Sequence, residues 1–301
     1  MSETTQERWN RLAELPLDRV GTPARFFHGT FTSIRDILAQ RELLNLLVRR
    51  ELRARYKDSS LGFLWSLARP LTQLFIYYVV IGRFLGASRA IPDFAIYVFT
   101  GLTAYTLLSE IIGSTTVSVV ANAGLVKKVY FPREIFPLAS VGSSLFNFCI
   151  QLVILIVFAS VTGHPPISPG TGYFFIALAL ILVYGTAVGL LTSALNVYLR
   201  DVQYLVEVLL LLLMWASPIV YSWNNVKHII GDGVLLNIYT DSPITLSVLG
   251  FQRALWTSGG TNYSPGDLLT RMLVALVVGV VLLFLTQRVF AKLQGNFAQE
   301  L

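Results

Sequence analysis

The feature that most constrains this chain is a series of apolar runs, each near the roughly 20 residues with which a helix crosses the hydrocarbon core of a bilayer. The composition agrees, because 54% of the residues are hydrophobic and 13% are charged, about half the charged share of an ordinary soluble domain. The runs do not alternate between apolar and polar residues, as the strands of a membrane β-barrel would. The sequence therefore predicts an all-α integral membrane protein with six transmembrane helices, at about 71–87, 94–119, 135–162, 172–195, 204–222 and 268–289.

The positions of the lysines and arginines orient these six helices. Most of the 23 lie before the first helix, in the loops after the second and fourth helices, and in the C-terminal tail. Cytoplasmic loops carry the excess of positive charge in membrane proteins, so both termini are expected in the cytoplasm. The net charge of +6 is then explained by topology, and no nucleic-acid partner is expected. The opposite, outer side receives Arg83, Arg89, Lys227, Arg253 and Arg271.

Residues 1–70 are predicted to form a cytoplasmic N-terminal segment, and residues 71–301 the transmembrane domain. No short apolar segment near the first residue marks a cleaved signal peptide. Between residues 34 and 52, apolar residues recur every three, four or seven positions and are separated by charged ones. This pattern predicts an amphipathic helix with a basic face, which suits the surface of a membrane. The alternative for the same pattern is a helix that packs on the transmembrane bundle.

A further apolar stretch, residues 233–256, lies between the fifth and sixth expected helices. Asp241 falls in its middle, and a charge at the centre of a bilayer costs at least about 2.5 kcal/mol. Pro243 suits the first turn of a new helix, with Asp241 or Ser242 as its cap. The stretch is therefore predicted to be a broken, re-entrant segment, in which two short helices dip into the outer leaflet and return.

Two longer motifs flank expected helices on the cytoplasmic side: RYKDSSLGFLWSLARP at 55–70 and LVKKVYFPREIFPLA at 125–139. They resemble the two motifs of the ABC-2 type permeases that export polysaccharides, lipopolysaccharide O-antigens and teichoic acids. The expected six helices, the interfacial helix and the broken segment match that family as well. The chain departs from the family at the break, where Ser242 precedes the proline and the family often has asparagine.

The resemblance implies the membrane subunit of an ABC exporter in the bacterial plasma membrane. Its substrate would be a polyprenyl-diphosphate-linked polysaccharide that moves from the cytoplasm to the outer face, and its working form would be a homodimer with two separate ATP-binding subunits. The sequence agrees, because it contains no G-x-x-x-x-G-K-[ST] loop to hold phosphates. ATP hydrolysis is therefore expected in the other subunit, and neither an enzymatic activity nor a cofactor is expected in this one.

The same analogy assigns residues to each task. A short helix that contains Asn122, Lys127, Lys128 and Tyr130 is expected to contact the ATP-binding subunits. At the substrate entrance, the cations Arg53, Arg55 and Lys57 are expected to meet the lipid diphosphate, with Trp65 at the depth of the headgroups.

Polar and aromatic residues within the expected helices are candidates for the channel. These are Tyr77, Tyr78, Glu110, Trp215 and Tyr221. Aromatic rings can stack on the apolar faces of sugars, and Glu110 can pair with a basic group of a gate. The alternatives are an interfacial belt for the aromatic residues and a hydrogen bond between packed helices for Glu110.

Three other functions have less support. Efflux of drugs or small lipids by a related ABC-2 permease would leave the first motif and the interfacial helix unexplained, and a purely structural scaffold would not need charges inside the membrane. A membrane-embedded glycosyl- or phosphotransferase would need acidic metal-binding motifs, whereas Glu134 and Asp201 stand alone. The three histidines and the single Cys149 show no metal-ligand spacing, so no metal site is expected.

Overall fold

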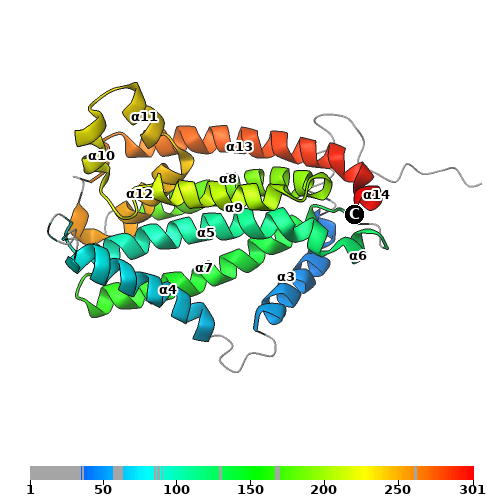
Figure 1. The fold of residues 1–301 in the computed structure, drawn as a ribbon, viewed down its shortest axis with the longest axis horizontal. Coiled ribbons are helices and arrows are strands. Elements are labelled where there is room, and N and C mark those ends of the chain that lie inside the picture. Colours follow the sequence, from blue (N-terminus) through cyan, green and yellow to red (C-terminus); the bar gives the residue numbers. More distant parts are fainter. Residues whose placement is uncertain are drawn as a thin grey trace, which may run out of the picture.

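The computed structural model describes residues 35, 37–56, 64–84, 86, 89, 91–128, 131–166, 170–260 and 263–301. Every regular element in these ranges is a helix (Figure 1). The elements are α3 (Arg41–Tyr56), α4 (Leu64–Ile76), η1 (Tyr77–Phe84), α5 (Phe94–Ala121), α6 (Ala123–Val126), α7 (Ile135–Val161), α8 (Thr171–Tyr198), α9 (Val202–Trp215), α10 (Trp223–Ile230), α11 (Val234–Thr240), α12 (Pro243–Leu255), η3 (Thr257–Gly259), α13 (Leu268–Leu293), η4 (Gln294–Asn296) and α14 (Phe297–Glu300). The prediction of an all-α architecture is confirmed for this part of the chain.

Four helices in the described ranges, α5, α7, α8 and α13, are long and apolar enough to cross a membrane. The shortest of them has 26 residues, which at 1.5 Å per residue is about 39 Å and exceeds the roughly 30 Å of the hydrocarbon core. They coincide with the second, third, fourth and sixth predicted spans. A fifth candidate arises if the bent pair α11 and α12 is counted as one span.

The first and fifth predicted spans are less regular. The 13 residues of α4 continue directly into η1, where the backbone changes to eight residues of π-helix. The 14 residues of α9 end at Trp215 and reach only about 21 Å. Its apolar run continues to 222, but Pro218 has no N–H to donate and disfavours helix in the residue before it, which ends the helix early. The count of six spans stays a prediction.

The break predicted near Pro243 is present as a bend of 69° between α11 and α12. Pro243 occupies the start of α12, and Ser242 takes the capping position without a side-chain hydrogen bond to the helix. Asp241 pairs instead with Arg271, whose guanidinium lies 2.7 Å from its carboxylate. Most of α12 is buried in the bundle, whereas its re-entrant path through the outer leaflet stays a prediction.

The bundle is built around α5, which packs against α7, α8 and α12, while α13 packs on the far side of α8. Small residues bring these helices close together, as is common in membrane bundles. A Cβ added to Gly189 of α8 would lie 2.0 Å from Thr115 Oγ1 of α5. In Figure 1, α10 and α11 lie at one end of the bundle, and α6, α14 and the C-terminus lie at the other.

The predicted amphipathic helix is α3, and it packs on α7 near the end that holds α6 and α14 (Figure 1). Leu47 is buried there in a second apolar cluster, together with Val126, Phe136 and Phe297. Leu46 points away and is exposed. One face of α3 thus packs on the bundle, which was the alternative to a helix at the membrane surface. Contact of its other face with lipid headgroups stays a prediction.

Candidate docking surface and transport residues

The short helix α6 projects from the end of α5 and presents a basic surface. Val126 is buried in the second apolar cluster and anchors the helix. Leu125, Lys127 and Lys128 are exposed around it. Of the residues expected to contact an ATP-binding subunit, Tyr130 lies outside the described residues. The arrangement provides two cations and one leucine on a surface that a second protein could cover.

Asn122, expected on the same surface, instead joins three elements. Its side-chain oxygen accepts a hydrogen bond from the Arg50 guanidinium of α3, and its amide donates to the Ser118 carbonyl of α5 at 2.8 Å. Asn122 also lies immediately before α6, at its capping position. Asn122 is therefore positioned to couple α3 to the start of α6.

A second polar contact ties α3 to α7. The carboxylate of Glu51 accepts hydrogen bonds from Ser140 at 3.2 Å and from Ser143 at 2.9 Å. Beside these contacts, Gly142 allows the backbone of α7 to approach Val48, because a Cβ there would lie 2.9 Å from Val48 Cγ2. Together, the polar and apolar contacts fix α3 against the N-terminal part of α7.

Glu134 lies just before α7 and is almost completely buried. Its carboxylate accepts a hydrogen bond from the Gln287 amide of α13 at 3.5 Å. Burial raises the pKa of Glu134 above its ordinary value, and hydrogen bonds and the nearby Arg288 offset only part of this effect. The neighbouring Arg133 guanidinium lies 5.9 Å from the centre of the Phe297 ring. This end of α7 is thereby tied to the C-terminal helices.

The predicted substrate entrance is described only in part. Arg53 is exposed near the end of α3, and the backbone of Arg55 continues that helix. Trp65 is the second residue of α4, of which the backbone is described, and Lys57 lies outside the described residues. The structure thus places one of the three cations at the surface and leaves their meeting with a lipid as a prediction.

The five channel candidates lie on different elements: α5, η1, the end of α9 and the turn after it. Glu110 of α5 accepts a hydrogen bond from the Asn147 amide of α7 at 2.6 Å, the packing contact that was its alternative role. Tyr77 and Tyr78 lie at the start of η1, where Tyr77 packs on the core. The Tyr78 hydroxyl accepts a hydrogen bond from the Arg83 guanidinium at 2.9 Å. The Tyr221 hydroxyl donates to the Trp215 carbonyl at 2.8 Å.

Two residues that the sequence did not single out hold the turn after α9. The buried Tyr97 hydroxyl lies 2.8 Å from the Pro218 carbonyl and 2.7 Å from the Tyr221 carbonyl. The Gln252 amide donates to the same Pro218 carbonyl at 2.9 Å. Pro218 was the available signal, because a proline that ends a helix inside an apolar run leaves carbonyls that need donors. Their partners are more than 30 residues away along the chain and give no local pattern.

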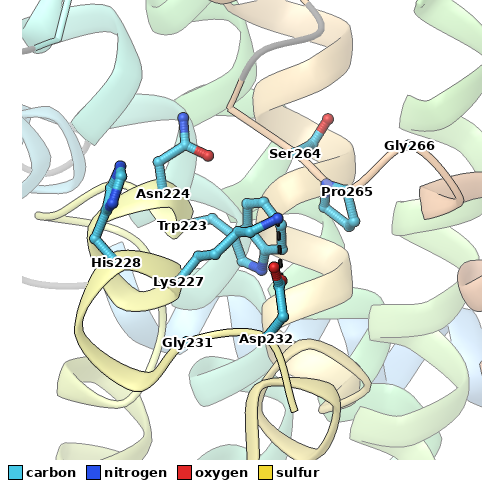
Figure 2. Close-up of a pocket in the computed structure, with 9 residues that line it drawn as sticks. All are labelled: Trp223, Asn224, Lys227, His228, Gly231, Asp232, Ser264, Pro265 and Gly266. Carbon is cyan, nitrogen blue, oxygen red and sulfur yellow. Dashed lines mark ion pairs between the residues drawn. The ribbon is translucent and has the colours of Figure 1, made fainter.

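A pocket of about 640 Å³ opens at the opposite end, between α10 and the loop before α13 (Figure 2). The Trp223 ring forms part of its wall, and the Lys227 ammonium lies 5.7 Å from the centre of that ring. Lys227 also pairs with Asp232 at 3.1 Å. Asn224, His228 and Ser264 complete a lining that mixes hydrogen-bond donors and acceptors.

Comparison with known proteins provides an independent view. A model of the ABC-2 type transporter family matches residues 42–256. The O-antigen export system permease protein RfbA of Klebsiella pneumoniae is 28% identical over 259 residues, which cover 86% of this chain and 94% of that protein. RfbA of Myxococcus xanthus is 26% identical over 268 residues, or 89% of this chain and 98% of that protein. The polysialic acid transport protein KpsM of Escherichia coli is 22% identical over 210 residues, which cover 64% of this chain and 79% of that protein.

Proposed function

The chain belongs to the ABC-2 type transporter family, and from that membership we propose that it is the membrane-spanning permease subunit of a polysaccharide exporter. Its substrate is a polyprenyl-diphosphate-linked glycan, of the O-antigen, galactan or teichoic acid type, which moves from the cytoplasm to the outer face of the bacterial plasma membrane. The observation that carries the proposal is the nearly full-length similarity to permeases named for O-antigen export.

The proposed working complex contains two copies of this chain and two ATP-binding subunits. The exposed surface of α6, with Leu125, Lys127 and Lys128, supports a protein contact at the cytoplasmic end. Large apolar side chains are exposed along η1 and α9, among them Phe84 and Leu205. Such side chains need lipid or a second copy to cover them, because contiguous apolar surface in water is unfavourable.

The contacts around α3 suggest how movement of the ATP-binding subunits reaches the membrane. When those subunits close on ATP, they displace α6, and the hydrogen bond between Arg50 and Asn122 carries the displacement to α3. Glu51 then carries it to the two serines of α7. Since α7 packs against the central α5, a small shift at the cytoplasmic end repositions the helices that flank the path of the glycan.

At the entrance, Arg53, Arg55 and Lys57 attract the diphosphate of the lipid carrier. Each basic residue near an anionic surface contributes about 1 kcal/mol. Replacing all three with Gln is expected to weaken substrate recruitment by roughly two powers of ten if the contributions add. The control replaces Arg41 and Arg49 with Gln, since both are exposed nearer the start of the same helix. Wild-type export by the triple variant would mean that the substrate enters elsewhere.

Within the membrane, the proposed path of the glycan uses aromatic side chains. Trp215 is the last residue of α9, and the Tyr221 hydroxyl six residues later donates to its carbonyl. Tyr77 and Tyr78 lie at the start of η1. Their rings stack on sugars, while Trp65 anchors the entrance at headgroup depth.

Deletion of the chain in its host tests the function. We expect the completed lipid-linked glycan to accumulate inside the cell, so that a lectin or antibody labels it after permeabilisation but not on intact cells. Unchanged surface glycan in the deletion strain would refute the proposal and would favour efflux of drugs or lipids. Absence of the glycan from both preparations would instead favour the glycosyl- or phosphotransferase alternative. Expression of the wild-type chain in the deletion strain must restore surface labelling.

A further inference from the structure

A groove of about 410 Å³ lies between α8, α12 and α13, on the side of the bundle that is predicted to face outward. Its lining is polar at one end and apolar along the wall. Asp241, Thr270 and Arg271 form a polar end, and Leu246, Val274 and Val278 belong to the apolar wall. A ligand that fills it must therefore combine a polar head with an apolar body.

The polar end is organised by the guanidinium of Arg271. One of its nitrogens donates to Asp241 at 2.7 Å, the Nε donates to Asp267 at 2.7 Å, and the third nitrogen donates to Asn237 at 3.1 Å. A guanidinium has five N–H donors, so among the described residues these contacts use three of them. Two donors therefore remain to bind an acceptor that enters the groove.

The charges of this cluster exclude a simple anion as the preferred ligand. One guanidinium faces two carboxylates, and the side chains of Asp241 and Asp267 are 53% and 55% exposed. A phosphate can accept from the remaining donors of Arg271, but the surplus negative charge requires a cation beside it. The geometry therefore fits a zwitterionic headgroup that has both a phosphate and a group that donates hydrogen bonds to carboxylates.

The apolar wall fits the rest of a phospholipid. Val274 and Val278 follow Arg271 by three and seven residues on one face of α13, and they are 61% and 56% exposed. At 1.5 Å per residue, Val278 lies about 10 Å deeper than Arg271, a distance over which an acyl chain can run along the helix. The wall is firm, because the Tyr184 hydroxyl of α8 donates to the Ala275 carbonyl at 2.9 Å.

We propose that this groove binds an outer-leaflet phospholipid with a primary ammonium group, namely phosphatidylethanolamine. The phosphate pairs with Arg271, the ammonium donates to Asp241 and Asp267, and an acyl chain covers Val274 and Val278. Phosphatidylcholine lacks the ammonium N–H donors, and phosphatidylglycerol lacks the cation. Because Asp241 stands at the 69° bend between α11 and α12, the bound lipid also braces that bend against α13.

The test uses the purified full chain, incorporated into vesicles of equal parts phosphatidylethanolamine, phosphatidylcholine and phosphatidylglycerol. After gentle detergent extraction, native mass spectrometry counts the lipids that each chain retains. Phosphatidylethanolamine is expected to be retained in preference to the other two. Arg271→Gln removes the charged donor to the phosphate and is expected to lower this retention about tenfold, which corresponds to about 1.4 kcal/mol. Lys227→Gln is the matched control, because its ion pair with Asp232 lies in a separate pocket.

A second variant separates lipid binding from folding. Val274→Trp fills the apolar part of the groove and leaves all three charged side chains in place, so it is expected to lower retention as well. Equal retention of the three lipids, preference for phosphatidylglycerol, or unchanged retention in both variants would overturn the proposal. A change of oligomeric state in Val274→Trp with unchanged lipid retention would mean that a second copy covers the groove, and would overturn it too. None of these outcomes depends on the identity of the exported glycan.

Discussion

The contact between Gly142 and Val48 allows a quantitative test of how α3 is held against α7. An added Cβ at position 142 would lie 2.9 Å from Val48 Cγ2, closer than side-chain carbons approach one another. Valine has little freedom at χ1, so α3 must shift to relieve the contact. Overpacking of this kind costs about 1–3 kcal/mol. Replacing a helical glycine by alanine returns about 0.5–1 kcal/mol. From the middle of the two ranges, Gly142→Ala is expected to destabilise the packed state by about 1 kcal/mol.

The assay is the midpoint of heat-induced loss of the monodisperse peak in gel filtration, measured on the protein in detergent. A loss of 1 kcal/mol lowers the midpoint by about 2–4 °C in chains of 150–250 residues, so a fall of a few degrees is expected for Gly142→Ala. Gly113→Ala in α5 is the matched control, because beyond the adjoining backbone of its own helix no described atom lies within 4 Å of its added Cβ. Export should fall with the stability of the α3 contact, since α3 is proposed to transmit movement from α6.

Val48→Ala supplies the decisive second half of this test. It removes Cγ2 and leaves Val48 Cβ, which lies 4.0 Å from the added Cβ in ordinary contact. In the Gly142→Ala background, Val48→Ala should therefore recover most of the lost stability. If Gly142→Ala is as stable as Gly113→Ala, or if Val48→Ala deepens the loss, then α3 does not pack tightly on α7 and the reasoning is wrong.

Three further predictions concern the end of the molecule that is proposed to lie in the cytoplasm. Changing both Lys127 and Lys128 to Glu should reduce co-purification with the ATP-binding subunit, whereas the same change at the exposed Lys292 should not; equal recovery would remove α6 from the docking surface. Burial raises the pKa of Glu134 in the folded state, so its contribution to stability falls as the pH rises from about 4.5 through the folded pKa. Glu134→Gln should therefore raise the midpoint of heat-induced unfolding at pH 8 and leave it nearly unchanged at pH 4. A lower midpoint for the variant at pH 8 would show that the ionised carboxylate stabilises the fold. A cysteine at Gln299, with Cys149 replaced, should resist a membrane-impermeant thiol reagent in intact cells, and its labelling would place the C-terminus outside.

Long-range partners account for most of what the sequence did not reveal. The long helices and the break at Pro243 were predictable, because uninterrupted apolar length and a proline are local signals. The early end of α9 was missed, since the apolar run continues past Pro218. The polar cluster around Arg271, at the start of α13, was missed for a different reason. Arg271 was counted only as an outer charge, and nothing local to it shows that a residue 30 positions earlier, Asp241, pairs with it.

For the predicted transport residues as well, features with a local sequence signal were predictable and contacts with distant residues were not. Glu110 proved to have a packing partner, Asn147, on another helix, a contact that a single sequence cannot reveal. The exposure of Lys127 and Lys128 was predictable, because two adjacent lysines between two long apolar helices are costly to bury. By contrast, the hydrogen bond between Asn122 and Arg50 of α3 joins residues that are 72 positions apart. No local pattern in the sequence predicts it.

Reconstituted transport tests the central claim most directly. The chain and the ATP-binding subunit that co-purifies with it are placed together in vesicles that contain the lipid-linked glycan, and the glycan is measured on each face with a lectin that cannot cross the membrane. ATP added on the side of the ATP-binding subunit should move glycan to the opposite face, and omission of either protein should abolish the movement. If the glycan crosses at the same ATP-dependent rate without this chain, or does not cross when both proteins are present as an assembled complex, then the chain is not the permease of a polysaccharide exporter.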